Sequence, residues 1–384
     1  MGVQLKNLKD QVIVITGASS GIGLVTAKMA AARGARVVLS ARNERDLQAA
    51  VDEIAAAGGR AAWIAADVSV TEEVEQIGQF ATEEFGGFDT WVNNAGTSIY
   101  GRLDEVKMED KRRLFDVNFW GTVNGCRVAV PHLRERGGAI INIGSVLSDV
   151  AIPLQGIYGA SKHAVKAYTD TLRMELEEAD APVSVSLIKP AAIDTPFYQH
   201  AMNYMDTEPK PAPPVYAPEV VAEAILACAE RPIRDVFAGG GGRVFSAMGY
   251  HAPRATDRYM EKTQFEGQQD ERGMLRDPEG NLYQHFDHDG GERGLYDGHV
   301  MQSSLYTSAK LHPAISLGAL VGAGLTAWAG YKFLETRRKS TGRRAGVSAS
   351  DLLYERMESA EREEGTGRGH VSADGWRLPS AERE

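Results

Sequence analysis

The feature that most constrains the fold is a regular alternation of short β-branched runs with longer helical segments between residues 11 and 238. The strand-like runs are residues 11–16, 35–40, 60–65, 88–93, 138–144, 183–188 and 234–239. The helical segments are residues 22–33, 44–57, 71–85, 108–133, 156–179 and 218–230. This alternation is typical of a parallel sheet covered by crossover helices. The sequence therefore predicts an α/β fold, a doubly wound parallel sheet (Rossmann fold) with one strand for each run.

The composition limits the classes of partner and compartment. The 384-residue chain has a formal net charge of −10 and a pI near 5.5, so it offers no basic surface for nucleic acid. Its two cysteines, Cys126 and Cys228, indicate neither a disulfide framework nor a structural zinc site, and we predict no metal site. Residues 1–10 are polar and lead directly into the first strand, which leaves no room for a secretory signal. We therefore expect a cytoplasmic protein.

A glycine-rich turn follows the first strand. The segment VIVITGASSGIG brings Gly17, Gly21 and Gly23 to the start of the first helix. Glycines there allow a tight turn and a close approach to a pyrophosphate, whose charge would face the N–H groups of the helix N-terminus. The glycines alone are also compatible with an ordinary tight turn. In this context of strand, turn and helix, they predict a dinucleotide-binding site.

The turn, three further motifs and two single residues resemble those of the short-chain dehydrogenase/reductase family. After TGASSGIG come NNAG (residues 93–96), Asn118, Ser145, YGASK from Tyr158 to Lys162, and PAAIDTPF from Pro190. The motifs occur in the family's order, and the resemblance covers roughly residues 8–240. It implies an NAD(P)-dependent oxidoreductase with the catalytic tetrad Asn118, Ser145, Tyr158 and Lys162. It also implies a homo-oligomer, formed through the helices that contain Asn118 and Tyr158.

The spacing of Tyr158 and Lys162 suits proton transfer. Residues four apart on a helix lie on one face, and a nearby ammonium favours the phenolate and lowers the tyrosine pKa. Tyr158 could then exchange a proton with a substrate oxygen, to which Ser145 would donate a hydrogen bond. The family resemblance implies that Lys162 also holds the nicotinamide ribose. It further implies that Asn118 fixes a water that links the lysine to solvent.

The end of the second strand bears on the choice between NAD and NADP. Ser40 occupies the place where an acidic residue would bind the ribose of NAD, and Arg42 follows with a guanidinium suited to a phosphate. We therefore predict NADP (NADPH) in preference to NAD, although Arg42 could instead be a solvated residue at a helix start. The resemblance assigns Asp67 and Val68 to the adenine; Asp67 could instead cap the helix that begins near Thr71. The predicted cofactor-binding residues are Gly17, Ser19, Ser20, Gly21, Ile22, Gly23, Ser40, Arg42, Asp67, Val68, Asn94, Ala95, Gly96, Tyr158, Lys162, Pro190, Ile193 and Thr195.

The loops expected around the nicotinamide are mostly apolar and hold no arginine cluster. The candidate substrate contacts are Leu147, Ile152, Pro153, Phe197, Tyr198, Met202, Tyr204 and Met205. They favour a small apolar carbonyl compound, or its alcohol, as substrate. Two alternatives stay open: a 3-oxoacyl thioester reductase, and a non-catalytic cofactor-binding membrane scaffold whose tail is the functional part.

The C-terminal third has a different composition from the rest of the chain. We divide the chain into a catalytic and NADP-binding domain (1–242), a helix with an irregular Gly/Asp-rich extension (243–310), an apolar helix (311–334) and a charged, disordered tail (335–384). Within the extension, residues 243–262 fit a helix and residues 264–300 fit an irregular loop. Within the tail, residues 352–363 fit a helix.

The apolar segment has two interpretations. Residues 314–331 carry no charge, and Gly318 and Gly322 form a GxxxG spacing of the kind found in transmembrane helices. The segment could equally be a buried helix at an oligomer interface. Arg337, Arg338 and Lys339 favour a cytoplasmic tail, whereas the cofactor-binding domain should also be cytoplasmic, so a single span does not satisfy both. We predict membrane association at the cytoplasmic face, with a soluble form as the alternative.

Overall fold

The structure is a computed structural model, and it describes residues 3–270, 279–287, 290–312, 326, 328, 330–332 and 349–363. It divides into two compact units, Met1–Pro313 and Ala314–Glu384. The first unit holds the predicted sheet together with the extension that follows it. The two units are described separately below.

The centre of the first unit is a seven-stranded parallel sheet with the strand order β11-β7-β6-β4-β1-β2-β3. The strands are β1 (Val12–Thr16), β2 (Arg36–Ala41), β3 (Arg60–Ala65), β4 (Thr90–Asn93), β6 (Gly138–Ile143), β7 (Val183–Pro190) and β11 (Asp235–Ala238). All seven predicted strands are confirmed. Because β1 pairs with β2 on one side and β4 on the other, the chain order reverses at β1, which is where doubly wound sheets bind ligands.

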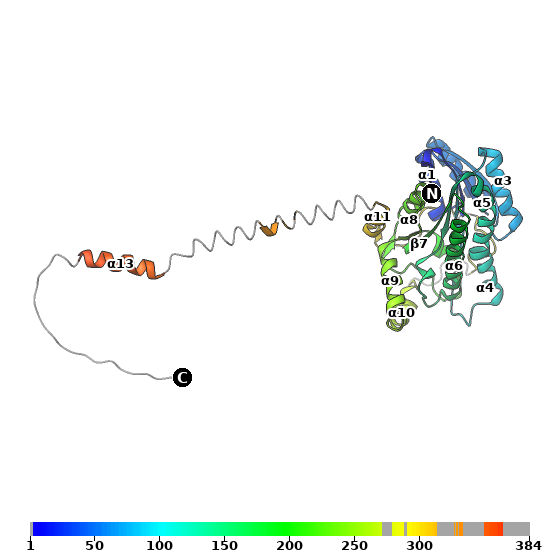
Figure 1. Cartoon of the computed structure of the whole chain (residues 1–384). Helices are drawn as coiled ribbons and strands as arrows, with labels where there is room; N and C mark the ends of the chain where they lie inside the picture. The colour runs from blue at the N-terminus through cyan, green and yellow to red at the C-terminus, as the bar shows by residue number, and fades with distance from the viewer. Residues whose placement is uncertain are drawn as a thin grey trace, which may run out of the picture. The chain divides into compact units, whose positions relative to one another are not determined.

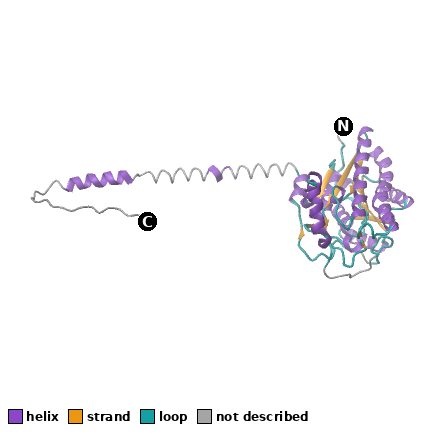
Figure 2. Ribbon diagram, turned by 90° about the horizontal axis from the view of Figure 1, so that it is seen from below, coloured by secondary structure: helices purple, strands orange, loops and turns teal. Residues whose placement is uncertain are grey.

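Helices cover both faces of this sheet (Figures 1 and 2). One face carries α1 (Gly21–Ala32), α2 (Glu44–Ala56) and α8 (Pro218–Glu230), and the other carries α3 (Thr71–Phe85), α5 (Gly121–Arg136) and α6 (Gly156–Glu178). Each face buries its own apolar cluster. Leu24, Leu47 and Leu226 belong to the first cluster, and Ile77, Leu133 and Leu176 belong to the second. This burial on both faces explains why the strands read as continuous apolar runs.

The predicted helix 108–133 is divided in three. It consists of α4 (Met108–Phe115), a π-helical turn η2 (Asp116–Trp120) and α5. Asn118 lies at the centre of the π turn. Such turns are rare and are frequent at functional sites.

The extension packs on the sheet as part of the same compact unit. The predicted helix 243–262 is two helices, α9 (Gly240–His251) and α10 (Pro253–Gly267), because Pro253 begins a new helix. The described residues that follow are largely irregular, as predicted. The remaining elements were not predicted: η1 (Leu8–Asp10), η3 (Val146–Ser148), α7 (Phe197–His200), α11 (Leu305–Leu311), the pair β5 (Ile99–Tyr100) and β9 (Met202–Asn203), and the three-stranded sheet of β8 (Ala192–Ile193), β10 (Val215–Tyr216) and β12 (Val300–Met301).

The second unit contains α13 (Ala349–Glu363), which confirms the predicted helix 352–363. The predicted apolar helix 311–334 falls largely on residues 313–325, which lie outside the described residues. Its first residue, Leu311, ends α11 and is buried in the core. Within the described ranges, no helix is both long and apolar enough to span a bilayer.

Candidate active site

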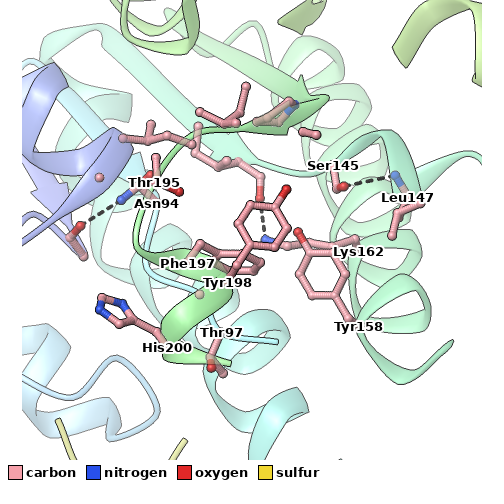
Figure 3. A pocket seen from close by; sticks show the side chains of 18 of the residues that line it. Asn94, Thr97, Ser145, Leu147, Tyr158, Lys162, Thr195, Phe197, Tyr198 and His200 are labelled. Atoms are coloured by element: carbon pink, nitrogen blue, oxygen red, sulfur yellow. Dashed lines mark hydrogen bonds between the residues drawn. The ribbon is translucent and has the colours of Figure 1, made fainter. Parts of the chain in front are cut away.

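A cavity of about 310 Å³ opens beyond the carboxyl ends of β1, β2, β4, β6 and β7. All but three of the predicted site residues line it, and Figure 3 shows ten of its lining residues labelled. The predicted residues that line it are Gly17, Ser19, Ser20, Gly21, Ile22, Arg42, Asp67, Val68, Asn94, Ala95, Gly96, Ser145, Tyr158, Lys162, Pro190, Ile193 and Thr195. The structure therefore brings together residues that are up to 178 positions apart in the sequence, from Gly17 to Thr195.

Gly23 and Ser40 are two of the three exceptions. A Cβ atom on Gly23 would lie 2.2 Å from the Gly17 carbonyl oxygen, so this glycine allows the helix to pack against the turn. The Ser40 side chain is buried, and its hydroxyl has no hydrogen-bond partner within the described part of the chain. Because side chains alternate along a strand, the neighbour Ala41 faces the cavity instead. Ala41, and not Ser40, thus lines the cavity at the end of β2, and the assignment of Ser40 to the acid's place stays a prediction.

The glycine-rich turn has the geometry of an anion cradle. Gly17 has a φ of +66°, and a Cβ there would lie 2.7 Å from the Ala95 Cα. The Asn94 side chain donates to the carbonyl oxygens of Thr16 (2.9 Å) and Gly17 (3.0 Å), which ties the turn to the end of β4. Ser20, the N-cap of α1, makes no side-chain hydrogen bond to the first turn. The cavity-lining backbone of this turn therefore fits a pyrophosphate.

Tyr158 and Lys162 project from α6 into the cavity, close to Ser145 (Figure 3). The Lys162 Nζ donates to the Ile143 carbonyl oxygen (2.8 Å) and lies 5.7 Å from the centroid of the Tyr158 ring. Burial lowers the pKa of Lys162 to about 8. Burial also raises the pKa of Tyr158 to about 12, and a hydrogen bond with Ser145 offsets only part of this shift. The predicted lowering of the Tyr158 pKa by the lysine was therefore wrong for this structure, because desolvation dominates.

Ser145 is held in place by local backbone contacts. It is the N-cap of η3, and its Oγ accepts a hydrogen bond from the Leu147 amide (3.0 Å), while its own amide donates to the Ser148 hydroxyl (3.1 Å). The Oγ thus accepts from an amide, and its hydroxyl proton is available for the hydrogen bond with Tyr158.

Asn118 is the third exception, because its side chain lies behind the cavity wall. Its Nδ2 donates to the Thr97 carbonyl oxygen (2.9 Å) and the Ser161 hydroxyl (3.1 Å), and its Oδ1 accepts from the Thr97 amide (2.9 Å). The Thr122 hydroxyl donates to its backbone carbonyl (2.9 Å). Asn118 thus fastens the loop after β4 to α6, and its predicted part in a water relay stays a prediction.

The opposite end of the cavity is bounded by Arg42 and Asp67. The Asp67 carboxylate accepts from Arg113 (2.5 Å) and from the amide and hydroxyl of Ser69 (2.9 and 2.7 Å). Burial would raise the pKa of Asp67, but these hydrogen bonds outweigh burial and hold the pKa below its usual range. Asp67 does not cap α3, whose N-cap is Val70 with no side-chain bond. Its carboxylate is thus part of the cavity wall.

The substrate end of the cavity differs from the prediction in its far wall. Leu147, Ile152, Phe197 and Tyr198 line it, whereas Pro153, Met202, Tyr204 and Met205 do not. The extension supplies Phe245, Met260 and Gln264 from α9 and α10, which were not predicted. Three further residues of the extension, Asn281, Leu282 and His285, line the cavity elsewhere and were not predicted either. The spacing of Met260 and Gln264, one helical turn apart on the buried face of α10, is a signal that could have indicated the helix contribution.

Comparisons with known proteins agree with this site. The family model described as short chain dehydrogenase matches residues 11–205. The uncharacterized oxidoreductase YxnA of Bacillus subtilis is 48% identical over 337 residues, which cover 86% of this chain and 93% of the relative. The 3beta-hydroxysteroid dehydrogenase 1 of Eggerthella lenta is 38% identical over 228 residues, which cover 57% of this chain and 86% of the relative.

Two solved structures share the fold. One is an alcohol dehydrogenase from the archaeon Thermococcus sibiricus complexed with 5-hydroxy-NADP, with a TM-score of 0.53 and 28% identity over 59% of this chain and 95% of that chain. The other is a short-chain dehydrogenase from Streptomyces avermitilis, with a TM-score of 0.56 and 27% identity over 67% of this chain and 98% of that chain. The chain belongs to the short-chain dehydrogenase family and is an NAD(P)-dependent oxidoreductase.

Proposed function

We propose that the protein interconverts an apolar ketone and its secondary alcohol, with NADP as cofactor and Tyr158 as the acid/base. The observation that carries this proposal is that Tyr158, Ser145 and Lys162 line one cavity together with the glycine-rich turn and several apolar side chains. The named activities of two relatives, a hydroxysteroid dehydrogenase and an alcohol dehydrogenase, support the same substrate class.

In the direction of reduction, the bound nicotinamide supplies the hydride to the carbonyl carbon. Tyr158 is protonated at neutral pH and donates its proton to the carbonyl oxygen as negative charge develops there. Ser145 donates a hydrogen bond to the same oxygen. The Lys162 ammonium stabilises the resulting phenolate and returns a proton to it, which its lowered pKa favours. In the direction of oxidation, each proton moves the opposite way.

The preference for NADP rests on the two residues that end and follow β2. Ala41 has no carboxylate that could bind a ribose hydroxyl or repel a 2′-phosphate. Arg42 lines the cavity beside it. The one acidic residue that lines the described cavity wall is Asp67, and its charge is balanced by Arg113 at 2.5 Å. This end of the cavity therefore suits a phosphate better than an unmodified ribose.

The far end of the pocket favours a substrate with a second polar group. Gln264 is 8% exposed, lines the pocket beside Phe245 and Met260, and its Oε1 has no hydrogen-bond partner among the described residues. Its Nε2 donates to the Thr263 hydroxyl (3.1 Å), which uses its own proton on the Tyr259 carbonyl (2.8 Å), so the amide orientation follows from the chemistry. A buried acceptor without a partner is costly. We infer that the substrate carries a hydrogen-bond donor, such as a hydroxyl, remote from its carbonyl.

The 3-oxoacyl thioester alternative lacks a basic site for its carrier. Within the described residues that line the cavity, the lysine and arginine side chains are Lys162 and Arg42, and both lie on the cofactor side. A phosphopantetheine or nucleotide carrier would need cations at the substrate end. The scaffold alternative makes a separate prediction, because a scaffold would bind NADPH without Tyr158-dependent turnover.

Two exposed apolar side chains support the proposed homo-oligomer. Trp120 is 52% exposed in η2 beside Asn118, and Met174 is 61% exposed on α6, the helix of Tyr158. Apolar side chains of this size on adjoining elements favour a contact with a second copy. The mass of the chain in solution, measured by light scattering, tests this. Membrane attachment through residues 311–334 stays a prediction.

The activity is tested by NADPH oxidation with a panel of ketones of increasing size, including steroid ketones. Tyr158→Phe should lower turnover by about a thousandfold while NADPH binding persists, because general acid catalysis typically contributes about 10²–10⁴-fold. Tyr100→Phe is the matched control, since the Tyr100 hydroxyl is buried, has no hydrogen-bond partner among the residues that the structure describes and does not line the cavity. Equal turnover by wild type and Tyr158→Phe would reject the proposed mechanism.

A further inference from the structure

Part of the Gly/Asp-rich extension, which the proposed proton and hydride transfers do not use, contacts several residues of the predicted cofactor site. We call its two described stretches, residues 279–287 and 290–294, the strap. Asn281, Leu282 and His285 of the strap line the cavity. Each stretch is hydrogen-bonded to residues that belong to the predicted cofactor site or adjoin it.

The first stretch meets the end predicted to bind the 2′-phosphate. Arg42 donates through Nη1 to the Tyr283 carbonyl oxygen (3.1 Å) and through Nη2 to the Asn281 carbonyl oxygen (2.5 Å). Asn43 donates to the Phe286 carbonyl oxygen (2.9 Å). The guanidinium that would bind the phosphate is therefore shared with the strap backbone.

The second stretch meets the pyrophosphate turn and the nicotinamide side. The Gly21 amide, in the first turn of α1, donates to the Gly291 carbonyl oxygen (2.7 Å). Lys28 on the same helix pairs with Glu292 (2.7 Å). The Gly294 amide donates to the Asp194 carboxylate (3.1 Å), next to the predicted cofactor-binding residue Thr195. The strap thus touches the site at three points along the length that a dinucleotide would occupy.

Two glycines explain how the strap lies so close to the site. A Cβ atom on Gly280, whose φ is +56°, would lie 2.5 Å from the His200 carbonyl oxygen. A Cβ on Gly294 would lie 2.5 Å from the Thr195 carbonyl oxygen. Any side chain at these positions would push the strap away from the walls of the cavity. The fit is therefore built into the sequence of the extension.

The strap is also anchored outside the cavity. Asp110, which is 4% exposed on α4, accepts a hydrogen bond from the Tyr283 hydroxyl through Oδ1 (2.6 Å). Its other oxygen, Oδ2, accepts from the Tyr204 hydroxyl, on the segment after β9. One carboxylate therefore holds a strap tyrosine and a tyrosine that is not part of the strap. This arrangement offers a matched pair of substitutions.

We propose that the strap forms the outer wall of the cofactor site and gates it, so that NADPH enters and leaves only when the strap lifts. The proposal rests on the proposed location of the dinucleotide in this cavity. The strap carbonyls accept hydrogen bonds from Arg42 and Gly21, two residues of the predicted cofactor site. Release of cofactor then requires that these contacts and the Tyr283–Asp110 anchor open, and the opening rate limits cofactor exchange.

The first test measures NADPH release from the full chain by stopped-flow fluorescence, with excess NADP⁺ as the chase. Tyr283→Phe should speed release by about tenfold, because a hydrogen bond to a charged group is lost from the closed strap only. Tyr204→Phe removes the other hydroxyl from the same carboxylate and should release NADPH at the wild-type rate. Equal release rates in Tyr283→Phe and wild type would overturn the gate.

The second test locks the strap with a disulfide between Asp46→Cys and Gly290→Cys. A Cβ built on Gly290 lies 3.1 Å from the Asp46 Cβ, so a small outward shift of the strap gives the spacing of about 3.5–4.5 Å that a disulfide needs. The natural thiols, Cys126 and Cys228, are buried, which raises the pKa of each to about 12 and keeps them unreactive. The NADPH-loaded, oxidised chain should retain its cofactor and release it after reduction.

The outcomes separate this proposal from the proposed function. A locked chain that exchanges NADPH as fast when oxidised as when reduced would overturn the gate and leave the oxidoreductase intact. A wild-type chain that binds neither NADPH nor NADH would overturn both.

Discussion

The core of the molecule and its C-terminal extension line one cavity, but only the contribution of the core could be predicted from sequence motifs. In the core, Tyr158, Lys162 and the glycine-rich turn lie in the cavity as their motifs predicted. In the extension, Gln264 and Asn281 line the same cavity without any motif. The residues that carry the reaction can therefore be found from short local sequence patterns, whereas the residues that enclose the site depend on contacts between distant segments. We therefore expect the two regions to control different measurable quantities.

The largest expected effect is a dependence on pH that belongs to the core alone. Burial lowers the pKa of Lys162 to about 8, so its ammonium is present below that pH and is lost above it. Ketone reduction consumes a proton and should fall by about tenfold for each pH unit above 8, whereas alcohol oxidation should rise towards the same pH. Initial rates between pH 6 and 10, in both directions, measure the two profiles.

The same measurement tests whether the core and the extension control different quantities. Tyr283→Phe alters the strap and leaves the surroundings of Lys162 unchanged, so its two profiles should coincide in shape with those of wild type. A shifted midpoint in that variant would mean that the extension tunes the proton-transfer groups, contrary to the division of roles proposed here.

A feature of the fold or of the site could be predicted from the sequence where residues close to it in the sequence determine it. The strands depend on sequence periodicity, and the glycine-rich turn depends on close approach of the backbone. A Cβ atom built on Gly23, for example, would lie only 2.2 Å from the Gly17 carbonyl oxygen. That Ala41 and not Ser40 lines the cavity could not be read from the sequence, because the face of each side chain is determined by the pairing of β2 with β1 and β3. The pKa of Tyr158 was predicted in the wrong direction because the depth of burial cannot be read from a helical spacing.

The extension could not be predicted for a related reason. Residues 279–294 have no periodicity, and their hydrogen bonds join them to partners such as Arg42 and Gly21, more than 230 positions away. A sequence rich in glycine and aspartate reads as an irregular loop whether it is solvated or lies against a binding site. The reason for a glycine at positions 280 and 294 becomes clear only in the structure, where each lies against a backbone carbonyl group.

The next largest effect is expected at Arg42, the residue that the core and the strap share. Arg42→Gln should weaken NADPH binding by about ten- to a hundredfold, because charge-assisted bonds to the 2′-phosphate are lost, and should leave NADH binding nearly unchanged. Calorimetric titration with both cofactors measures the two affinities. Arg45→Gln, on the exposed start of α2, is the control and should alter neither affinity. Equal losses for NADPH and NADH would mean that Arg42 acts through the strap and does not contact the phosphate.

The smallest effect is expected at Gln264, where the extension contacts the substrate. The Oε1 of Gln264 is a buried acceptor without a partner among the described residues, so a substrate hydroxyl that reaches it removes the cost of leaving this acceptor unsatisfied. Gln264→Leu should therefore lower kcat/KM by about fivefold for a ketone that carries a distal hydroxyl, which corresponds to about 1 kcal/mol. For the same ketone without the hydroxyl, kcat/KM should stay level or rise, since the leucine leaves no polar atom unpaired. Because NADPH release is controlled elsewhere in the extension, this variant should release cofactor at the wild-type rate. An equal loss for both ketones would show that Gln264 only shapes the pocket, and the extension would then enclose the substrate without selecting it.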